Sequence, residues 1–196
     1  MEQKGVTYID IHTHNPRSGV VSPTMRGVHP WDAEHIFEVP DLSDTDIIGE
    51  IGLDKACGVD MEAQRRLFEL HLAEAERVQK PIVLHVVKAF EEVMNIVSKY
   101  KIESVVFHGF IGSTEQAKRA TDRGYYLSFG ERSLRSPKSC RALEQTPIDR
   151  LFCETDDDPE TSIAEIYEKV ANLRNISVEE LARQIVENYK RVIHKI

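Results

Sequence analysis

The sequence has 196 residues, of which 41% are hydrophobic and 30% charged, and its formal net charge is −8. This length predicts a single globular domain over residues 1–196, and no stretch approaches the apolar length of a membrane span. The acidic balance excludes a nucleic-acid binder held by a broad basic surface, although it allows a nuclease with a local basic rim. We also expect a cytoplasmic protein, because no apolar segment typical of a secretion signal precedes the first predicted strand.

Short apolar runs alternate with helical patterns along most of the chain. After an apolar run at Tyr8 and Ile9, the pattern predicts five strands, at 47–52, 82–86, 104–108, 125–129 and 151–154. Helices are expected near 61–79, 88–100, 113–123 and 138–145. Two further helices open at capping signals, Ser162 with Glu165 and Ser177 with Glu180.

Regular alternation of strand and helix predicts parallel strands joined by helical crossovers. Two architectures satisfy it, an open doubly wound sheet and a closed α/β barrel. No glycine-rich phosphate fingerprint follows any of the strands, which disfavours the nucleotide-binding version of the open sheet. In a barrel, functional side chains gather where strands end. The residues at the strand ends therefore decide the function.

The segment DIHTH at residues 10–14 places two histidines on either side of Thr13. Residues i and i+2 of an extended chain share a face, so His12 and His14 point in the same direction. Two neutral imidazoles so placed form half of a transition-metal site. From the spacing alone, a histidine pair on a solvated loop is an equally good interpretation.

Further ligand-type residues follow the other strands: His29, Glu50, His85, His108 and Asp156. The carboxylates have an alternative role as helix caps or surface acids, and His85 and His108 have one as hydrogen-bonded core histidines. Two roles fit His29 equally well. It contacts the substrate or a metal ligand, or it makes a structural hydrogen bond within the turn that contains it.

The remaining titratable side chains carry less information. His35, His71 and His194 fit no strand end and are predicted to be surface or helix-face residues. The three cysteines, Cys57, Cys140 and Cys153, are an odd number without C-x-x-C spacing. This argues against a disulfide framework and against a cysteine zinc site, so we expect free thiols.

The number of candidate ligands bears on mechanism. Without His29, four imidazoles and two carboxylates still exceed what one ion needs, and a carboxylate such as Glu50 can bridge two ions about 3.5–4 Å apart. We therefore expect two divalent metal ions. Such a pair generates a hydroxide near neutral pH and stabilises the leaving group, which indicates hydrolysis rather than redox chemistry or group transfer.

Six ordered segments, DIHTH, GVHPW, IGEIGLD, PIVLH, VFHGF and LFCETD, resemble the TatD-like deoxyribonucleases, metal-dependent hydrolases with a barrel of the TIM type. The resemblance implies one ion held by His12, His14 and Asp156, and a second held by His85 and His108, with Glu50 between them. It also implies hydrolysis of DNA phosphodiester bonds by a metal-bridging hydroxide. Asp156 and Glu50 are then the catalytic candidates, with Asp156 as a proton acceptor.

The ions are expected to be zinc, manganese or magnesium, and nitrogen-rich ligation favours the first two on chemical grounds. The expected partner is DNA or a small phosphodiester, with no membrane and no obligate protein partner inferred. An amidohydrolase-type esterase, amidase or lactonase, and a non-catalytic metal-stabilised binding protein, are the alternative functions.

The chain departs from the family pattern at two places. Only residues 15–26 separate DIHTH from GVHPW, and twelve residues hardly accommodate a helical crossover, so the TIM-like barrel should be short by a strand or distorted between its first two strands. After His85, the family's arginine is missing and Lys88 offers a charge without a bidentate fork. The segment after Phe129, which we expect to be a loop, carries Arg132, Arg135, Lys138 and Arg141. We predict that Arg132 and Arg135 contact phosphate, with ordinary solvated charge as the alternative.

Overall fold

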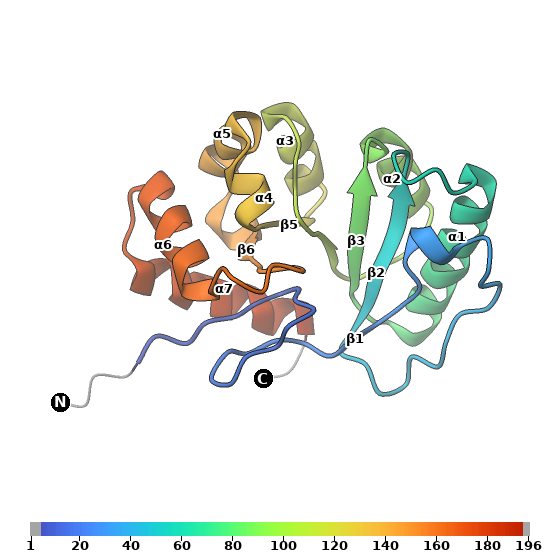
Figure 1. Cartoon of the computed structure of the whole chain (residues 1–196), viewed down its shortest axis with the longest axis horizontal. Helices are drawn as coiled ribbons and strands as arrows, with labels where there is room; N and C mark the ends of the chain where they lie inside the picture. Colours follow the sequence, from blue (N-terminus) through green and yellow to red (C-terminus); the bar gives the residue numbers. More distant parts are fainter. Residues whose placement is uncertain (1–4, 194–196) are drawn as a thin grey trace. The chain divides into compact units, whose positions relative to one another are not determined.

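The structure is a computed structural model that describes residues 5–193 (Figure 1). The chain forms two compact units. The first unit consists of the chain up to Ser22 and from Gly109 onward, and the second unit is Pro23–His108. The expectation of one domain over the whole chain stays a prediction. Among residues 5–193, no helix has the length and apolar character needed to cross a bilayer.

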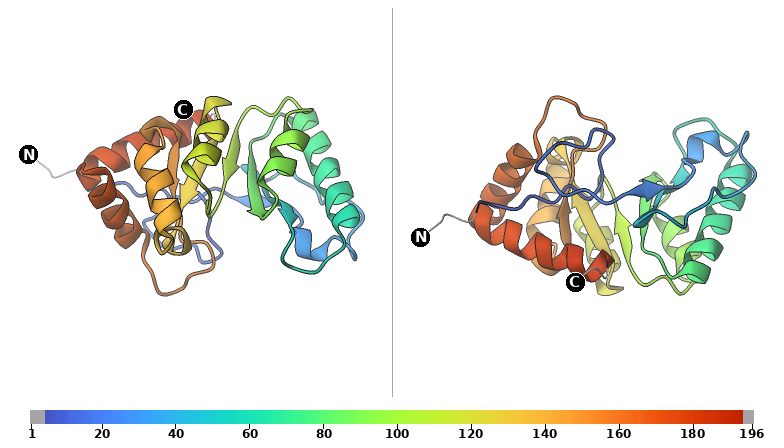
Figure 2. Two further views of the ribbon diagram at one scale, coloured as in Figure 1. Left: turned by 90° about the horizontal axis from the view of Figure 1, so that it is seen from above. Right: turned by 90° about the horizontal axis from the view of Figure 1, so that it is seen from below.

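The second unit is built on four parallel strands, which are hydrogen-bonded in chain order: β1 (Met25–Arg26), β2 (Ile47–Asp54), β3 (Ile82–Val87) and β4 (Val105–Phe107). Helix α1 (Met61–Val78) joins β2 to β3, and α2 (Phe90–Val97) joins β3 to β4. Both helices lie on the same side of β2 and β3 (Figure 2). Because parallel strands are buried on both faces, β2 and β3 are nearly continuous apolar runs.

The first unit contains the parallel pair β5 (Tyr126–Phe129) and β6 (Leu151–Cys153). Its helices are α3 (Thr114–Asp122), α4 (Glu131–Leu134), α5 (Pro137–Gln145), α6 (Ile163–Arg174) and α7 (Val178–Ile193). The predicted capping box opens α6, because Ser162 Oγ accepts from Glu165 N and Glu165 Oε2 accepts from Ser162 N.

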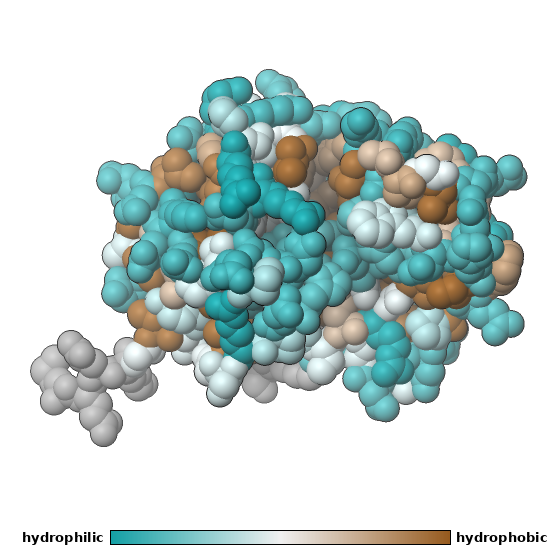
Figure 3. Space-filling view, viewed as in Figure 1, coloured by the Kyte–Doolittle hydropathy of each residue, from teal (hydrophilic) through white to brown (hydrophobic). Residues whose placement is uncertain are grey.

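The predicted strands and longer helices are confirmed within a few residues of their ends. One expectation is wrong: the segment after Phe129 is not a loop, because Glu131–Leu134 forms α4 and α5 already begins at Pro137. All three cysteines are free, as expected. The face drawn in Figure 3 is mostly hydrophilic, with hydrophobic side chains in small separate groups.

The N-terminal part of the first unit is extended without forming a regular strand. Ile11 N donates to the carbonyl oxygen of Cys153, the last residue of β6, and Ile9 forms a parallel bridge with Val21. Between His14 and Val21 the chain makes only bends and a turn, in which Gly19 adopts φ +81°. A short turn therefore lies where a helical crossover would be, and the next strand, β1, has two residues. The distortion of the barrel at this seam stays a prediction.

Candidate functional site

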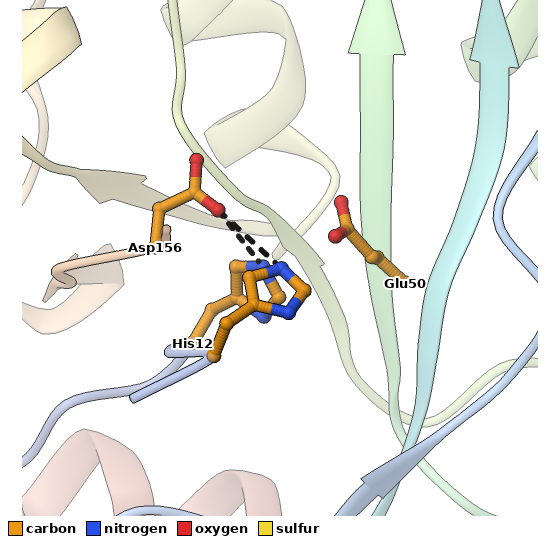
Figure 4. A group of neighbouring side chains, drawn as sticks. His12, Glu50 and Asp156 are labelled. Carbon is orange, nitrogen blue, oxygen red and sulfur yellow. Dashed lines mark ion pairs between the residues drawn. The ribbon is translucent and has the colours of Figure 1, made fainter. Parts of the chain in front are cut away.

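The first-unit cluster consists of His12, His14 and Asp156. His12 Nε2 lies 3.4 Å from Asp156 Oδ1 (Figure 4). His14 Nε2 lies 3.7 Å from the same oxygen. The His12 side chain is 4% exposed and that of His14 is 52% exposed. The two imidazoles therefore converge as their i, i+2 spacing predicts, and the three residues offer ligand atoms within 4.8 Å of one another.

Backbone pairing positions Asp156 opposite the two histidines. Asp156 N donates to His12 O at 3.0 Å, and His14 N donates to Asp156 O at 2.9 Å. Asp156 itself has φ +54°, in the left-handed region that aspartate tolerates better than most residues. This conformation ends the extended run at the residue whose carboxylate faces the imidazoles.

A buried carboxyl group anchors the preceding residue. Asp10 accepts hydrogen bonds from Thr155 N at 3.1 Å and from Thr155 Oγ1 at 2.6 Å. Burial raises the pKa of Asp10 to about 7, although the bonds from Thr155 lower it. Because Asp10 lies two residues before His12 and Thr155 one before Asp156, this contact fixes both sides of the first-unit cluster.

The second-unit cluster is centred on Glu50 in β2, with His85 in β3 and His108 directly after β4. Glu50 Oε2 lies 2.8 Å from His108 Nε2 and 3.2 Å from His85 Nδ1, and these two nitrogens are 3.3 Å apart. All three side chains are nearly buried. Two imidazole nitrogens and a carboxylate oxygen that converge in this way form a donor set that zinc or manganese accepts.

A glycine permits the close packing of β2 against β3 at this point. Gly52 is paired with His85 and has φ +145°. A Cβ atom added to Gly52 would lie 2.1 Å from His85 O, which backbone atoms cannot accommodate. Any larger residue would therefore displace the strand that carries His85.

Asp54 orients His85 and was assigned no role by the sequence. Its Oδ2 lies 3.2 Å from His85 Nε2 and accepts a hydrogen bond from Trp31 Nε1 at 2.8 Å. Burial by itself would raise the pKa of Asp54, but the hydrogen bonds from Trp31, Ala56 and His85 outweigh it and hold the pKa below its usual value. An ionised Asp54 carboxylate can only accept a hydrogen bond, so the His85 tautomer with its proton on Nε2 would leave the Nδ1 lone pair available to a metal ion.

His29 combines the two interpretations that the sequence left open. Its Nδ1 accepts the hydrogen bond from Trp31 N at 3.3 Å, which caps the short 3-10 helix Pro30–Asp32. Burial, helped by His85, lowers the pKa of His29 to about 4, so the ring is neutral near pH 7. Its proton is then on Nε2, 3.6 Å from Glu50 Oε2. His29 therefore presents a donor to the second-unit cluster rather than a lone pair for a metal.

One face of α1 supports both Asp54 and the turn before His29. Gln64 Oε1 accepts from Asp54 N at 2.8 Å, and Gln64 Nε2 donates to Asp54 O at 3.0 Å. Two turns further on, His71 Nε2 accepts from Val28 N at 3.1 Å while Nδ1 bonds to Leu67 O at 2.9 Å.

The prediction that His71 is a surface residue is wrong, since its ring is fully buried. His35 is exposed, and His194 lies outside the described residues.

Replacing His71 with alanine should lower the free energy of unfolding by about 3 kcal/mol at pH 7.5, because two buried hydrogen bonds and their packing are lost. Burial lowers the pKa of His71 from 6.5, so below pH 6.5 the unfolded chain binds more protons at this residue than the native protein. The stabilisation is complete above pH 6.5 and declines as the pH falls. Urea unfolding at pH 7.5 and at pH 5 measures this effect. The difference in the free energy of unfolding between wild type and H71A should be smaller at pH 5.

The matched control is His35→Ala, which removes an exposed histidine from the same unit. Its effect should stay within about 0.5 kcal/mol at both pH values. If the difference in the free energy of unfolding between wild type and H71A stayed constant across this pH range, that result would contradict a neutral His71.

The predicted phosphate-binding residues are all exposed. Lys88 follows β3 with φ +53°. Arg132 donates to Asp157 Oδ2 at 2.9 Å, which places its guanidinium beside the residue after Asp156. Arg135 pairs instead with Glu131 one helical turn away, at 3.2 Å. Of the two arginines, Arg132 is thus the one held next to the first-unit cluster.

Comparison with known proteins identifies the class. Residues 11–194 match the family described as TatD related DNase. The chain is 30% identical over 194 residues to the "uncharacterized metal-dependent hydrolase YabD" of Bacillus subtilis, covering 85% of this chain and 75% of that protein. A deoxyribonuclease, Tat-D of Schizosaccharomyces pombe, is 31% identical over 113 residues, covering 55% of this chain and 36% of that protein.

Solved structures show the same fold. The TatD homologue YJJV of Escherichia coli K12 aligns with a TM-score of 0.81 at 19% identity, covering 96% of this chain and 98% of that one. A TatD family hydrolase of Entamoeba histolytica aligns with a TM-score of 0.77 at 19% identity, covering 89% and 75%. The α/β fold expected from the sequence, of the TatD barrel type, is confirmed.

The matching family and the named relatives together identify a metal-dependent hydrolase. Within that class, the chain belongs to the TatD-related DNase family.

Proposed function

We propose that the chain hydrolyses phosphodiester bonds, in DNA or in smaller phosphodiesters, with the help of two divalent metal ions. The observation that carries this proposal is the repetition of one donor set: His12 and His14 converge on Asp156, and His85 and His108 converge on Glu50. Each set joins two imidazoles to a carboxylate, which suits zinc or manganese. The family resemblance adds support for Glu50 as a metal ligand.

Divalent ions bound by these residues would lower the pKa of water and neutralise charge on the phosphate. The protein's own groups then have distinct tasks. Asp54 keeps the Nδ1 lone pair of His85 available, and the His29 Nε2 proton is placed to donate to a phosphate oxygen. Asp156 accepts the proton of the attacking water. Lys88 and Arg132 supply positive charge to the substrate backbone.

The test is hydrolysis of bis(p-nitrophenyl) phosphate, followed by labelled single-stranded DNA. Chelation with EDTA should abolish turnover of both compounds, and manganese or zinc should restore it better than magnesium. A protein that binds these metals and cleaves neither compound would overturn the proposal. Esters and lactones would then be the next substrates, and failure with those would leave a metal-stabilised binding protein.

The double substitution Arg132→Ala with Arg135→Ala should raise KM for DNA about fivefold and leave kcat nearly unchanged. Exposed charges of this kind contribute about 1 kcal/mol, and salt screens them. The difference in KM should therefore shrink between 50 mM and 500 mM salt. Lys118→Ala on α3, which removes an exposed charge paired with Asp122, is the control. An unchanged KM in the double variant would remove both arginines from the substrate path.

A further inference from the structure

The only tryptophan in the sequence, Trp31, lies beside the second-unit cluster with 56% of its surface exposed. It is the middle residue of the 3-10 helix Pro30–Asp32, one residue after buried Pro30. A large aromatic side chain left in water gains nothing for folding from its exposed area. Its exposed position beside the second-unit cluster therefore indicates a role in ligand binding.

The exposed indole is nevertheless held firmly. Its Nε1 donates to Asp54 Oδ2 at 2.8 Å. The imidazole of His29 meets it edge-to-face, with ring centroids 4.6 Å apart and planes at 84°, and that of His85 lies at 6.1 Å and 79°. Behind the turn, Arg66 donates to Ala33 O at 3.0 Å and so ties the following loop to α1. The ring is fixed in place before any ligand arrives, which lowers the entropy cost of binding.

The same carboxylate oxygen, Asp54 Oδ2, contacts both the indole Nε1 and His85 Nε2. A flat ring stacked on Trp31 would therefore lie one side chain away from a candidate metal ligand. Nucleobases are flat rings that the sugar links to the phosphodiester, and stacking on an aromatic side chain binds any base without reading the sequence. Stacking is also an affinity source that an acidic protein can use, because it does not depend on a broad basic surface.

We propose that Trp31 is the stacking platform for a nucleobase next to the scissile phosphate, an inference that rests on the proposed phosphodiesterase function. Trp31 is then a substrate-binding residue that favours nucleotides over phosphodiesters without a base. Phe37, which is also exposed in this unit, stacks against Arg66 instead and is not part of the platform.

Because Trp31 is the sole tryptophan, its fluorescence reports directly on stacking. Thymidine 5′-monophosphate should quench the emission in a saturable manner, whereas 2-deoxyribose 5-phosphate, which lacks the base, should leave it nearly unchanged. This measurement needs no turnover, so it remains decisive if the protein cleaves no phosphodiester. An equal response to the two ligands, or no response to either, would overturn the proposal.

Kinetic measurements distinguish base stacking on Trp31 from the hydrogen bond that Trp31 donates to Asp54. Trp31→Ala should raise KM about tenfold for thymidylyl-thymidine and change it little for the same compound with an abasic residue. Trp31→Phe, which keeps a flat ring but lacks the N–H group, should recover most of the loss. Phe37→Ala should behave as wild type on both substrates. An equal rise in KM for the two substrates would mean that Trp31 acts only through Asp54, and the proposed stacking platform would be rejected.

Discussion

Substitution of Glu50 by glutamine should reduce metal-dependent phosphodiester hydrolysis roughly 1,000-fold. Glu50 Oε2 is the atom on which His85 and His108 converge, at 3.2 and 2.8 Å. The amide is nearly isosteric but carries no charge, so it leaves the fold intact while weakening the attraction for a divalent ion. Steady-state hydrolysis of bis(p-nitrophenyl) phosphate, together with metal content after gel filtration, measures both effects.

Glu62→Gln is the matched control, because Glu62 is an exposed glutamate on α1 in the same unit. It should retain wild-type activity and metal content. If the Glu50 variant kept full activity, the second-unit cluster would not be the reacting centre, and the proposed roles of Glu50, His85 and His108 would all fail.

Asp156→Asn should produce a comparable loss of activity together with the loss of one metal equivalent. Asp156 Oδ1 is the common neighbour of His12 Nε2 and His14 Nε2, so in the proposed site its charge would attract the cation. The backbone hydrogen bonds of Asp156 do not involve the side chain and should hold the variant in its native conformation. Elemental analysis of the metal-loaded variant counts the ions that remain.

Asp122→Asn, at the exposed end of α3, serves as the control for a lost carboxylate in the same unit. Comparing Asp156→Asn with Glu50→Gln also tests the two-ion proposal. Loss of one metal equivalent from each variant agrees with one ion at each cluster. Full retention of both metals by Asp156→Asn would contradict a metal site at His12 and His14.

Local patterns in the sequence were sufficient for the strands and for the convergence of His12 with His14. Both follow from the two-residue period of extended chain, which needs no knowledge of tertiary contacts. The capping box at Ser162 is local in the same sense. Helix α4 could not be found this way, because four residues after Gly130 carry neither a helical period nor a side-chain cap.

Residues whose roles depend on distant parts of the chain were missed. His71 has ordinary helix neighbours, and only the bond from Val28 N, 43 residues away, makes it a buried structural group. Asp54 ends a recognised segment, but its function comes from Trp31 and His85, which lie 23 and 31 positions away. A histidine or an aspartate in a single sequence does not reveal such partners.

The order of the units along the chain has a consequence for how the protein is made. The second unit is one continuous segment, whereas the first is split around it. Ile9 exchanges hydrogen bonds with the hydroxyl of Tyr167, 158 residues later, and Ile11 bonds to Cys153. During synthesis from the N-terminus, the strands of Pro23–His108 can pair before β6 and α6, the partners of Ile11 and Ile9, have been synthesised. The DIHTH segment is thus synthesised early, but its contacts form late, and a chain shortened before β6 would leave it without its native partners at Cys153, Thr155 and Asp156.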